Sequence, residues 1–461
     1  MRHFDLCVIG SGSGNSIIDE RFDAWKVALV DGQEWFGGTC LNVGCIPTKM
    51  LAYPADVAES SRHAARLGVD AGSVTVRWND VRDRVFGRID AIVAGGEAYR
   101  RDSANVALYR DRAHFVAPRV LAVGDEQLSA DRFVIAAGSR PWLPDVPGID
   151  DPALADRIHT SDSIMRLGSL PKSLIIVGGG LVAVEFAHVF AAYGTQVTLL
   201  HRGQALLRHE DEAVSRRFTD LLSRRVVLRL GQQVASIDDA DGRIEVGTID
   251  DDGIEYYFEA EHVLVATGRV SNADTLSLGA TGVEVDENGL VRVDEFQRTT
   301  ADGIWALGDV SSPWQLKHVA NREARVVQHN LLHPDDLEAS DHRFVPHAVF
   351  SGPQVASVGL TEQACREQGL RYAVGQRDYG SVAYGWAMED IDHFAKVIAD
   401  PATGRLIGAH IIGPDAANLI QPLVQAMSTG LDLQTMARGQ YWIHPALAEV
   451  VENALLAVEL D

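Results

Sequence analysis

The chain has 461 residues, too many for one hydrophobic core, so several domains are expected. Apolar residues make up 46% and charged residues 23% of it, which is ordinary for a globular protein. The formal net charge of −23 argues against nucleic acid or an anionic membrane as a partner, because both would repel the chain.

Cysteine usage and hydropathy point to a cytoplasmic protein. The four cysteines are Cys7, Cys40, Cys45 and Cys365, which imply no disulfide framework. Cys7 lies in an apolar run and is expected in the core, whereas Cys365 lies in a polar helical pattern and is expected to have no chemical role. The chain enters its first strand at once, and no apolar run approaches the ~20 residues of a membrane span.

The first predicted element is a buried strand over residues 4–9, followed by a glycine-rich turn. The glycines of the turn are Gly10, Gly12 and Gly14. A helical segment should follow, and then an apolar strand over residues 27–30 that ends at Asp31. This order predicts a dinucleotide site, in which the turn approaches a pyrophosphate and Asp31 binds ribose hydroxyls. One departure is Asn15, which stands where a third small residue is usual.

The next stretch, residues 37–49, holds Cys40 and Cys45 in a glycine-rich approach to a helix-prone run. If a helix begins here, Cys45 lies near its positive end, which favours a thiolate. Cys40 would lie close enough to form and open a disulfide with it, so the pair could hold two electrons. A static disulfide and half of a zinc site are the alternatives, although a zinc site needs four ligands and no second cysteine pair exists.

This stretch resembles the redox-active segment of the flavin disulfide reductases, a family that includes glutathione reductase and dihydrolipoamide dehydrogenase. The resemblance covers nearly the whole chain and implies an α/β fold with two Rossmann-like domains and a C-terminal α+β dimerisation domain. The implied segments are 1–148 for the FAD domain with the dithiol, 149–269 for the NADPH domain, 270–339 for a segment that completes the FAD domain, and 340–461 for the interface domain.

Residues 51–110 are expected to be helices that cover the flavin sheet, and strands should resume near residues 113–123. The resemblance also implies which further residues bind the flavin. They are Gly38, Thr39, Lys49, Gly138, Gly268 and Asp309.

A second dinucleotide unit begins with a strand at residues 173–177. Its glycine turn carries Gly178, Gly180 and Ala183. The next strand ends at His201 instead of an acid, and Arg202 and Arg208 follow. An acid would repel a 2′-phosphate whereas arginine forks bind one, so NADPH is predicted rather than NADH. Two solvated surface arginines are the alternative.

The resemblance implies a charge pair beside the flavin, and two positions of this chain differ from those of many relatives. Glu185, in the helix after the second glycine turn, should pair with Lys49 beside the flavin and stabilise its reduced form. Leu181 stands where glutathione reductases have a tyrosine over the nicotinamide pocket. Many relatives have threonine-proline where this chain has Lys317 and His318. The lysine-histidine form resembles that of the mycothione reductases within the family.

From about residue 340 the pattern alternates like antiparallel strands, followed by helices. The expected strands are 346–350, 355–359, 396–398 and 407–412. Near the end, His444 precedes a proline and Glu449 follows, so the carboxylate could orient the imidazole and stabilise its protonated form. A histidine before a proline is more often structural. Together with a redox dithiol, however, the resemblance implies an acid–base couple that acts on the dithiol of the opposite subunit.

The predicted protein is therefore a homodimeric FAD enzyme that reduces a small-molecule disulfide with NADPH through Cys40 and Cys45. No metal is expected. Similarity within the family indicates mycothiol disulfide as the substrate, with glutathione reductase and a dihydrolipoamide dehydrogenase-like enzyme as alternatives. A quinone- or dye-reducing flavoprotein, and a subunit of a larger dehydrogenase assembly, are the hypotheses outside this reaction.

Overall fold

The computed structural model describes residues 1–460, so residue 461 at the end of the predicted interface domain lies outside the described residues. The chain forms two compact units, each assembled from three separate stretches. The first unit is Met1–Met50, Asp80–Trp142 and Gly268–His342, and the second is Leu51–Asn79, Leu143–Thr267 and Arg343–Asp461. The division into four functional segments stays a prediction.

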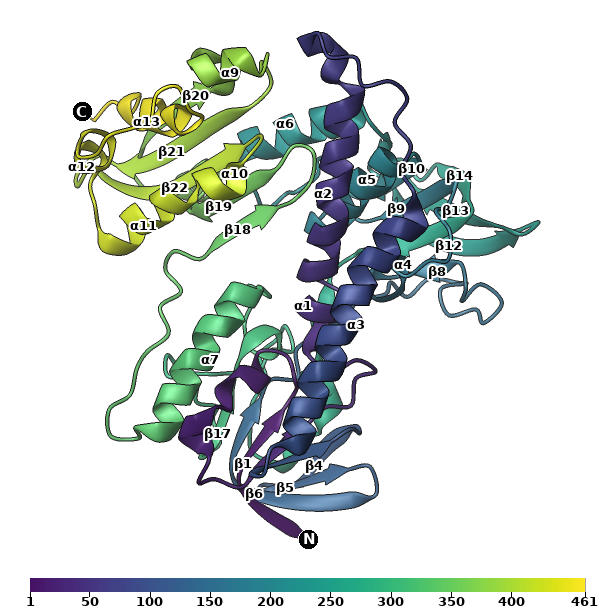
Figure 1. Cartoon of the computed structure of the whole chain (residues 1–461), viewed down its shortest axis with the longest axis vertical. Coiled ribbons are helices and arrows are strands. Elements are labelled where there is room, and N and C mark those ends of the chain that lie inside the picture. The colour runs from purple at the N-terminus through teal and green to yellow at the C-terminus, as the bar shows by residue number, and fades with distance from the viewer. Residues whose placement is uncertain (461) are drawn as a thin grey trace. The chain divides into compact units, whose positions relative to one another are not determined.

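The first unit is built on a seven-stranded sheet (Figure 1). Its order is β3 (Val106–Tyr109), β2 (Val27–Val30), β1 (Arg2–Ile9), β6 (Glu126–Ile135), β5 (Val120–Val123) and β4 (Ala113–Ala117), with β17 (Ile304–Ala306) paired to β6. Strands β3, β2, β1, β6 and β17 run parallel, so their carboxyl ends meet at one edge, where α/β sheets bind ligands. The strands predicted at 4–9 and 27–30 are confirmed.

Side chains alternate between the two faces of this sheet. Leu6 and Val8 of β1 pack on one face with Val327 of α7 (Lys317–Leu332). Cys7 and Ile9 pack on the other face, so Cys7 is a core residue as predicted.

The α-helix expected after the first glycine turn is absent from the described residues of this region, and that prediction was wrong. Two short 3₁₀ turns, η1 (Gly14–Ile17) and η2 (Glu20–Phe22), take its place. The β-branched Ile18 is extended, and the side chain of Asp19 accepts a hydrogen bond from the Arg21 backbone N–H and starts the second turn. The buried guanidinium of Arg100 binds the freed carbonyls of Asn15 and Ile18, each at 2.8 Å.

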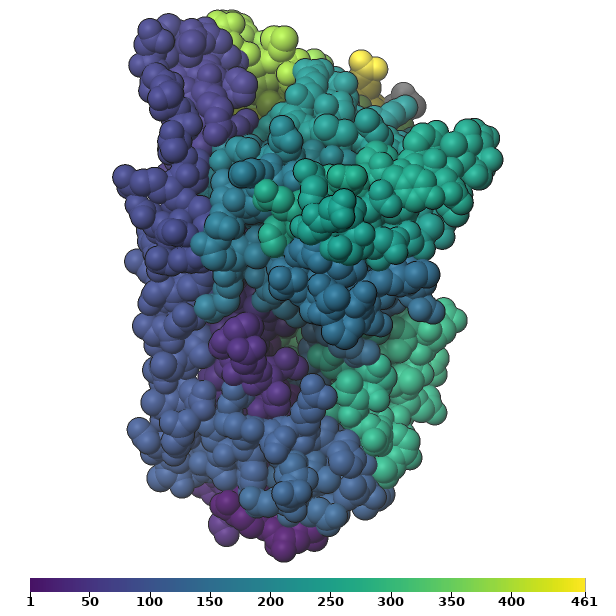
Figure 2. Space-filling view, turned by 90° about the vertical axis from the view of Figure 1, so that its right-hand side faces the viewer, coloured from purple at the N-terminus to yellow at the C-terminus, as the bar shows by residue number. Residues whose placement is uncertain are grey.

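The second unit contains a five-stranded parallel sheet. Its order is β11 (Val227–Leu230), β10 (Gln196–His201), β9 (Ser173–Val177), β15 (His262–Val265) and β8 (Ile158–His159). Helices α5 (Leu181–Tyr193) and α6 (Glu212–Ser223) belong to the same lobe. A three-stranded antiparallel sheet, β12 (Gln233–Ala240), β13 (Arg243–Ile249) and β14 (Glu255–Ala260), forms the teal-green projection in Figure 2.

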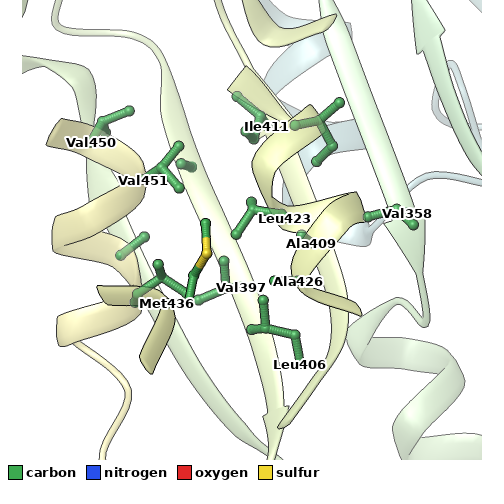
Figure 3. Packing of buried hydrophobic residues seen from close by; sticks show 14 of the residues in the cluster. Val358, Val397, Leu406, Ala409, Ile411, Leu423, Ala426, Met436, Val450 and Val451 are labelled. Atoms are coloured by element: carbon green, nitrogen blue, oxygen red, sulfur yellow. The ribbon is translucent and has the colours of Figure 1, made fainter. Parts of the chain in front are cut away.

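The carboxyl-terminal part of the second unit is a five-stranded antiparallel sheet. Its order is β18 (Pro346–Val349), β19 (Val355–Gly359), β22 (Arg405–Ile412), β21 (Phe394–Asp400) and β20 (Ala373–Asp378). Helices α11 (Gln421–Thr429), α12 (Leu433–Arg438) and α13 (Ala448–Leu456) pack on it. Leu423, Met436 and Val451 from these helices meet Val397 and Leu406 of the sheet in one core (Figure 3). The four predicted strands are confirmed, and β20 was not predicted.

The remaining elements are short, apart from two long helices. They are α1 (Gly38–Asn42), α2 (Cys45–Arg62), α3 (Trp78–Asp102), β7 (Ser139–Pro141), α4 (Ser161–Ile164), β16 (Arg269–Ser271), α8 (Glu362–Glu367), α9 (Ala383–Ala387) and α10 (Ala416–Leu419). Within residues 1–460, none of the helices combines the length and the apolar character that crossing a bilayer requires.

Candidate active site

The first glycine turn and Asp31 meet at the carboxyl edge of the first sheet. The Asp31 side chain is 4% exposed, and it accepts hydrogen bonds from the backbone N–H groups of Ser11 at 3.1 Å and Gln33 at 2.8 Å. Ser11 Oγ in turn accepts from the N–H of Gly37 at 2.7 Å. The turn, the acid and the cysteine segment are therefore held together in one unit.

The glycines of this region leave room for an extended dinucleotide. A Cβ on Gly38 would lie 2.6 Å from Gly12 Cα, so these two backbone segments approach each other with no side chain between them. A Cβ on Gly138, whose φ is +68°, would meet no atom within 4 Å, so the space beside it is open. The open backbone and the buried carboxylate fit FAD, and Gly10, Gly12, Gly14, Gly38, Thr39 and Asp31 would hold it. Because η1 has only four residues, backbone amides of the glycine turn, rather than a long helix, would face the pyrophosphate.

The two cysteines lie on consecutive helices of the first unit. Cys40 is in α1, and Cys45 is the first residue of α2, which confirms the helix predicted to begin there. No disulfide joins Cys40 and Cys45 in the structure. Hydrogen bonding with the Cys45 side chain, and then burial, raise the pKa of the Cys40 thiol well above its ordinary value. Cys40 is therefore a thiol at neutral pH and needs a base before it can attack.

Three further predicted flavin residues come together where the chain leaves and re-enters the first unit. Asp309 Oδ2 accepts a hydrogen bond from Ser139 Oγ at 2.7 Å, next to Gly138. The Gly268 carbonyl accepts from the Trp142 N–H at 2.9 Å. Strand β7, which begins at Ser139, pairs antiparallel with β16, which begins directly after Gly268.

The predicted pair of Lys49 and Glu185 is divided between the two units, so it stays a prediction. Glu185 lies in α5, is 2% exposed, and accepts a hydrogen bond from the Phe350 backbone N–H at 2.8 Å. A carboxylate this deeply buried is held in one orientation by that bond.

The second glycine turn has the form that binds a pyrophosphate. A Cβ on Gly178 would lie 2.2 Å from the Ala266 carbonyl oxygen, so only glycine fits there. Gly180 is the N-cap of α5 and has no side chain that could cap the helix. A Cβ added to it would meet no atom within 4 Å. The first amides of this 13-residue helix can face a phosphate. Ala183 is fully buried behind them, and Leu181 is 43% exposed.

A cluster of basic side chains follows β10. His201 ends this strand, and its ring lies over the turn, 2.6 Å from where a Cβ on Gly179 would be. Burial, and then the positive charges of Arg208 and Arg202, lower the pKa of His201, so its imidazole is neutral at pH 7. Both arginines are exposed. The end of β10 thus presents two cations and no acid, which can hold a 2′-phosphate.

His444 and Glu449 are joined directly in the second unit. His444 Nδ1 lies 2.7 Å from Glu449 Oε1, and Glu449 Oε2 accepts a hydrogen bond from the Ala446 N–H at 3.1 Å. The hydrogen bond from His444 lowers the pKa of Glu449, so the carboxylate is ionised at neutral pH. It can therefore orient the ring and stabilise an imidazolium, while the exposed Nε2 edge is available to exchange protons.

Lys317 lies close enough to the first glycine turn and to Cys40 to interact with both, which the sequence did not predict. Its Nζ donates a hydrogen bond to Ser13 Oγ at 2.8 Å, and its charge acts on Cys40. Lys317 is the first residue of α7. A cation at the positive end of a helix is unfavourable unless an anion is bound nearby, and this could have been noticed in the sequence. Within residues 1–460 no group of three or more His, Cys, Asp or Glu side chains could bind a metal.

Comparisons with known proteins cover both parts of the chain. Residues 4–324 match the pyridine nucleotide-disulphide oxidoreductase family, and residues 345–455 match its dimerisation domain. The mycothione reductase of Mycobacterium tuberculosis strain H37Rv is 52% identical over 99% of this chain and 100% of its own. A glutathione reductase of Burkholderia cepacia is 33% identical over 97% of each chain. The solved structure of RclA, an HOCl-induced flavoprotein disulfide reductase of Escherichia coli, is 27% identical over 99% of this chain and 100% of its own, with a TM-score of 0.86.

Proposed function

Because this chain belongs to the pyridine nucleotide-disulphide oxidoreductase family, we propose that it reduces mycothiol disulfide with NADPH in the cytoplasm. The protein is an FAD-dependent disulfide oxidoreductase that uses FAD and NAD(P)H. Its dimerisation domain supports a homodimer. The 52% identity to a mycothione reductase carries the choice of substrate, and Arg202 and Arg208 support the choice of NADPH.

The proposed chemistry uses residues from both units. When bound, FAD would supply the two-electron chemistry for reduction of the Cys40–Cys45 disulfide by NADPH, and the first glycine turn and Asp31 would hold it. Cys45, at the positive end of α2, is then held as a thiolate. Lys49 and Glu185 would form the charge pair beside the flavin.

His444 from the second subunit removes the proton that Cys40 retains because of its raised pKa. The Cys40 thiolate attacks one sulfur of the substrate, whose S–S bond breaks, and protonated His444 gives its proton to the leaving thiolate. Cys45 then attacks the Cys40 sulfur, which releases the second thiolate and restores the Cys40–Cys45 disulfide. Glu449 stabilises the imidazolium between these two proton transfers.

The experiment that tests the substrate is NADPH oxidation by the purified holoenzyme with mycothiol disulfide and glutathione disulfide in parallel. We expect kcat/KM for mycothiol disulfide to be at least ~100-fold higher, because a site built for one polar substrate rejects others strongly. Comparable values for the two disulfides would contradict the proposal. A quinone assay after alkylation of the reduced enzyme is the control, since a quinone reductase would keep its activity and a dithiol enzyme would lose it.

A further inference from the structure

The chain is anchored on both sides of Arg208, by a backbone hydrogen bond before it and by buried charged side chains after it. Arg208 itself is exposed, but both of its neighbouring stretches are anchored. On one side, Leu207 has a φ of +51°, which is strained for a residue other than glycine, and its N–H donates to the Gly179 carbonyl at 2.8 Å. This bond ties the segment to the second glycine turn.

On the other side of Arg208, Glu210 is held by the C-terminal antiparallel sheet. Its side chain is 5% exposed and lies 2.5 Å from both Ser357 Oγ of β19 and His347 Nε2 of β18. Ser357 Oγ also lies 3.1 Å from Nδ1 of the fully buried His410. Burial is the largest influence on Glu210 and raises its pKa, but the hydrogen bonds and charges of His347, Ser357 and His410 together outweigh burial and lower the pKa overall.

Asp211 makes a second anchor, with one partner from the same sheet and one from α8. It is fully buried, and its carboxylate binds Lys396 Nζ of β21 at 2.9 Å and accepts from the Glu362 backbone N–H at 3.0 Å. It also caps α6 by accepting from the Ala213 N–H at 3.0 Å. Lys396 is 3% exposed and binds Glu362 as well, at 2.5 Å.

Burying the three charged groups Glu210, Asp211 and Lys396 to hold one surface segment is costly, and apolar packing would hold it at least as firmly. What hydrogen-bonded ion pairs add is a fixed direction for the backbone that they hold. We propose that Glu210 and Asp211 are positioning residues, which aim Arg208 at the 2′-phosphate of the nucleotide through their bonds to the C-terminal sheet. This inference rests on the proposed preference for NADPH.

The preference for phosphate is measured without catalysis, from the binding of 2′,5′-ADP and 5′-AMP to the holoenzyme by calorimetry. We expect Glu210→Gln to weaken 2′,5′-ADP about tenfold and 5′-AMP less than twofold, because only the phosphate contact depends on the direction of Arg208. Ser357→Ala, which removes one of the two side-chain contacts of Glu210, together with the contact to His410, and keeps the charge of Glu210, should shift 2′,5′-ADP binding the same way by about two- to threefold. The matched control is Glu212→Gln, whose partner Arg366 is exposed and which should change neither affinity.

Arg208→Ala separates the two hypotheses. If Arg208→Ala leaves the ratio of the two affinities unchanged, the proposed phosphate site itself is wrong. If Arg208→Ala lowers the ratio but Glu210→Gln and Ser357→Ala do not, only the positioning role is wrong. Equal weakening of both nucleotides by Glu210→Gln would also overturn it, since a merely structural residue would have that effect. In the same variants, the KM for NADPH should rise as the affinity for 2′,5′-ADP falls, and the KM for NADH should change as little as the affinity for 5′-AMP.

Discussion

His444 is a candidate acid–base residue that is open to solvent in the single chain. Its side chain is 71% exposed in the single chain, whereas that of its partner Glu449 is 17% exposed. An imidazole that is fixed at Nδ1 and open at Nε2 is arranged to exchange protons with a group outside its own domain. The neighbouring apolar side chains of Tyr441 and Ile443 are also exposed, at 103% and 76%. Exposed apolar groups of this kind favour a contact surface.

We expect His444→Ala to lower disulfide turnover by ~100-fold or more, because general acid–base catalysis contributes about that much. Flavin reduction by NADPH, followed by stopped-flow absorbance, should change less than twofold, because His444 takes no part in it. His114→Ala, at an exposed histidine of β4, is the matched control and should alter neither step. Equal loss of both half-reactions in His444→Ala would exclude the proposed role.

At the scale of elements, the cluster around Glu210 ties the parallel and antiparallel sheets of the second unit together. Burial is the largest single influence and lowers the pKa of His347, but the hydrogen bond and the charge of Glu210 together raise this pKa overall. A histidine whose pKa is raised on folding stabilises the folded state fully below its unfolded value of about 6.5. That stabilisation is lost as the pH rises through the raised folded value.

We therefore expect the difference in Tm between the wild type and His347→Gln to be larger at pH 6 than at pH 9. A charged hydrogen bond is worth about 1.5–3 kcal/mol, so the difference at pH 6 should be roughly 2–4 °C and should shrink by pH 9. Differential scanning fluorimetry at both pH values measures it, with His114→Gln as the control. A difference that is constant or grows with pH would show that the ionised pair is not what stabilises this contact.

At the scale of the whole molecule, the proposal divides each active site between two subunits, with the cysteines from one and His444 from the other. Mixed dimers test this. Cys45→Ser and His444→Ala are each inactive as homodimers under the proposal. A dimer of one Cys45→Ser and one His444→Ala subunit has one intact site, made of the normal cysteines of one chain and the normal His444 of the other.

The mixed dimer purified after co-expression of the two variants should therefore have roughly half of the wild-type activity, because one of its two sites is intact. The measurement is disulfide-dependent NADPH oxidation by the purified mixed dimer, carrying two different tags. No recovery, with the mixed dimer shown to have formed and to bind FAD, would place the cysteines and His444 of one site in the same chain.

Local patterns were enough to predict the strands beside the two glycine turns and one helix start. Apolar runs bounded by glycine turns predicted β1, β2, β9 and β10, because a buried parallel strand needs a continuous apolar stretch between turns. The start of α2 at Cys45 followed from the run after the cysteines. The helix predicted after Gly14 failed because a side chain far away in the sequence, Arg100, binds carbonyls that a helix would have used.

The sequence by itself determined the chemistry available to this protein: a dithiol five positions apart, two glycine turns, a pair of arginines without an acid, and a histidine with its carboxylate. These signals are local, so spacing alone carries them. Only the tertiary structure decided how they are held. Lys396 binds Asp211 across 185 positions of sequence, and Ser357 binds Glu210 across 147. Such pairs have no local pattern, because a buried charge is stable only where the fold brings its partner to it.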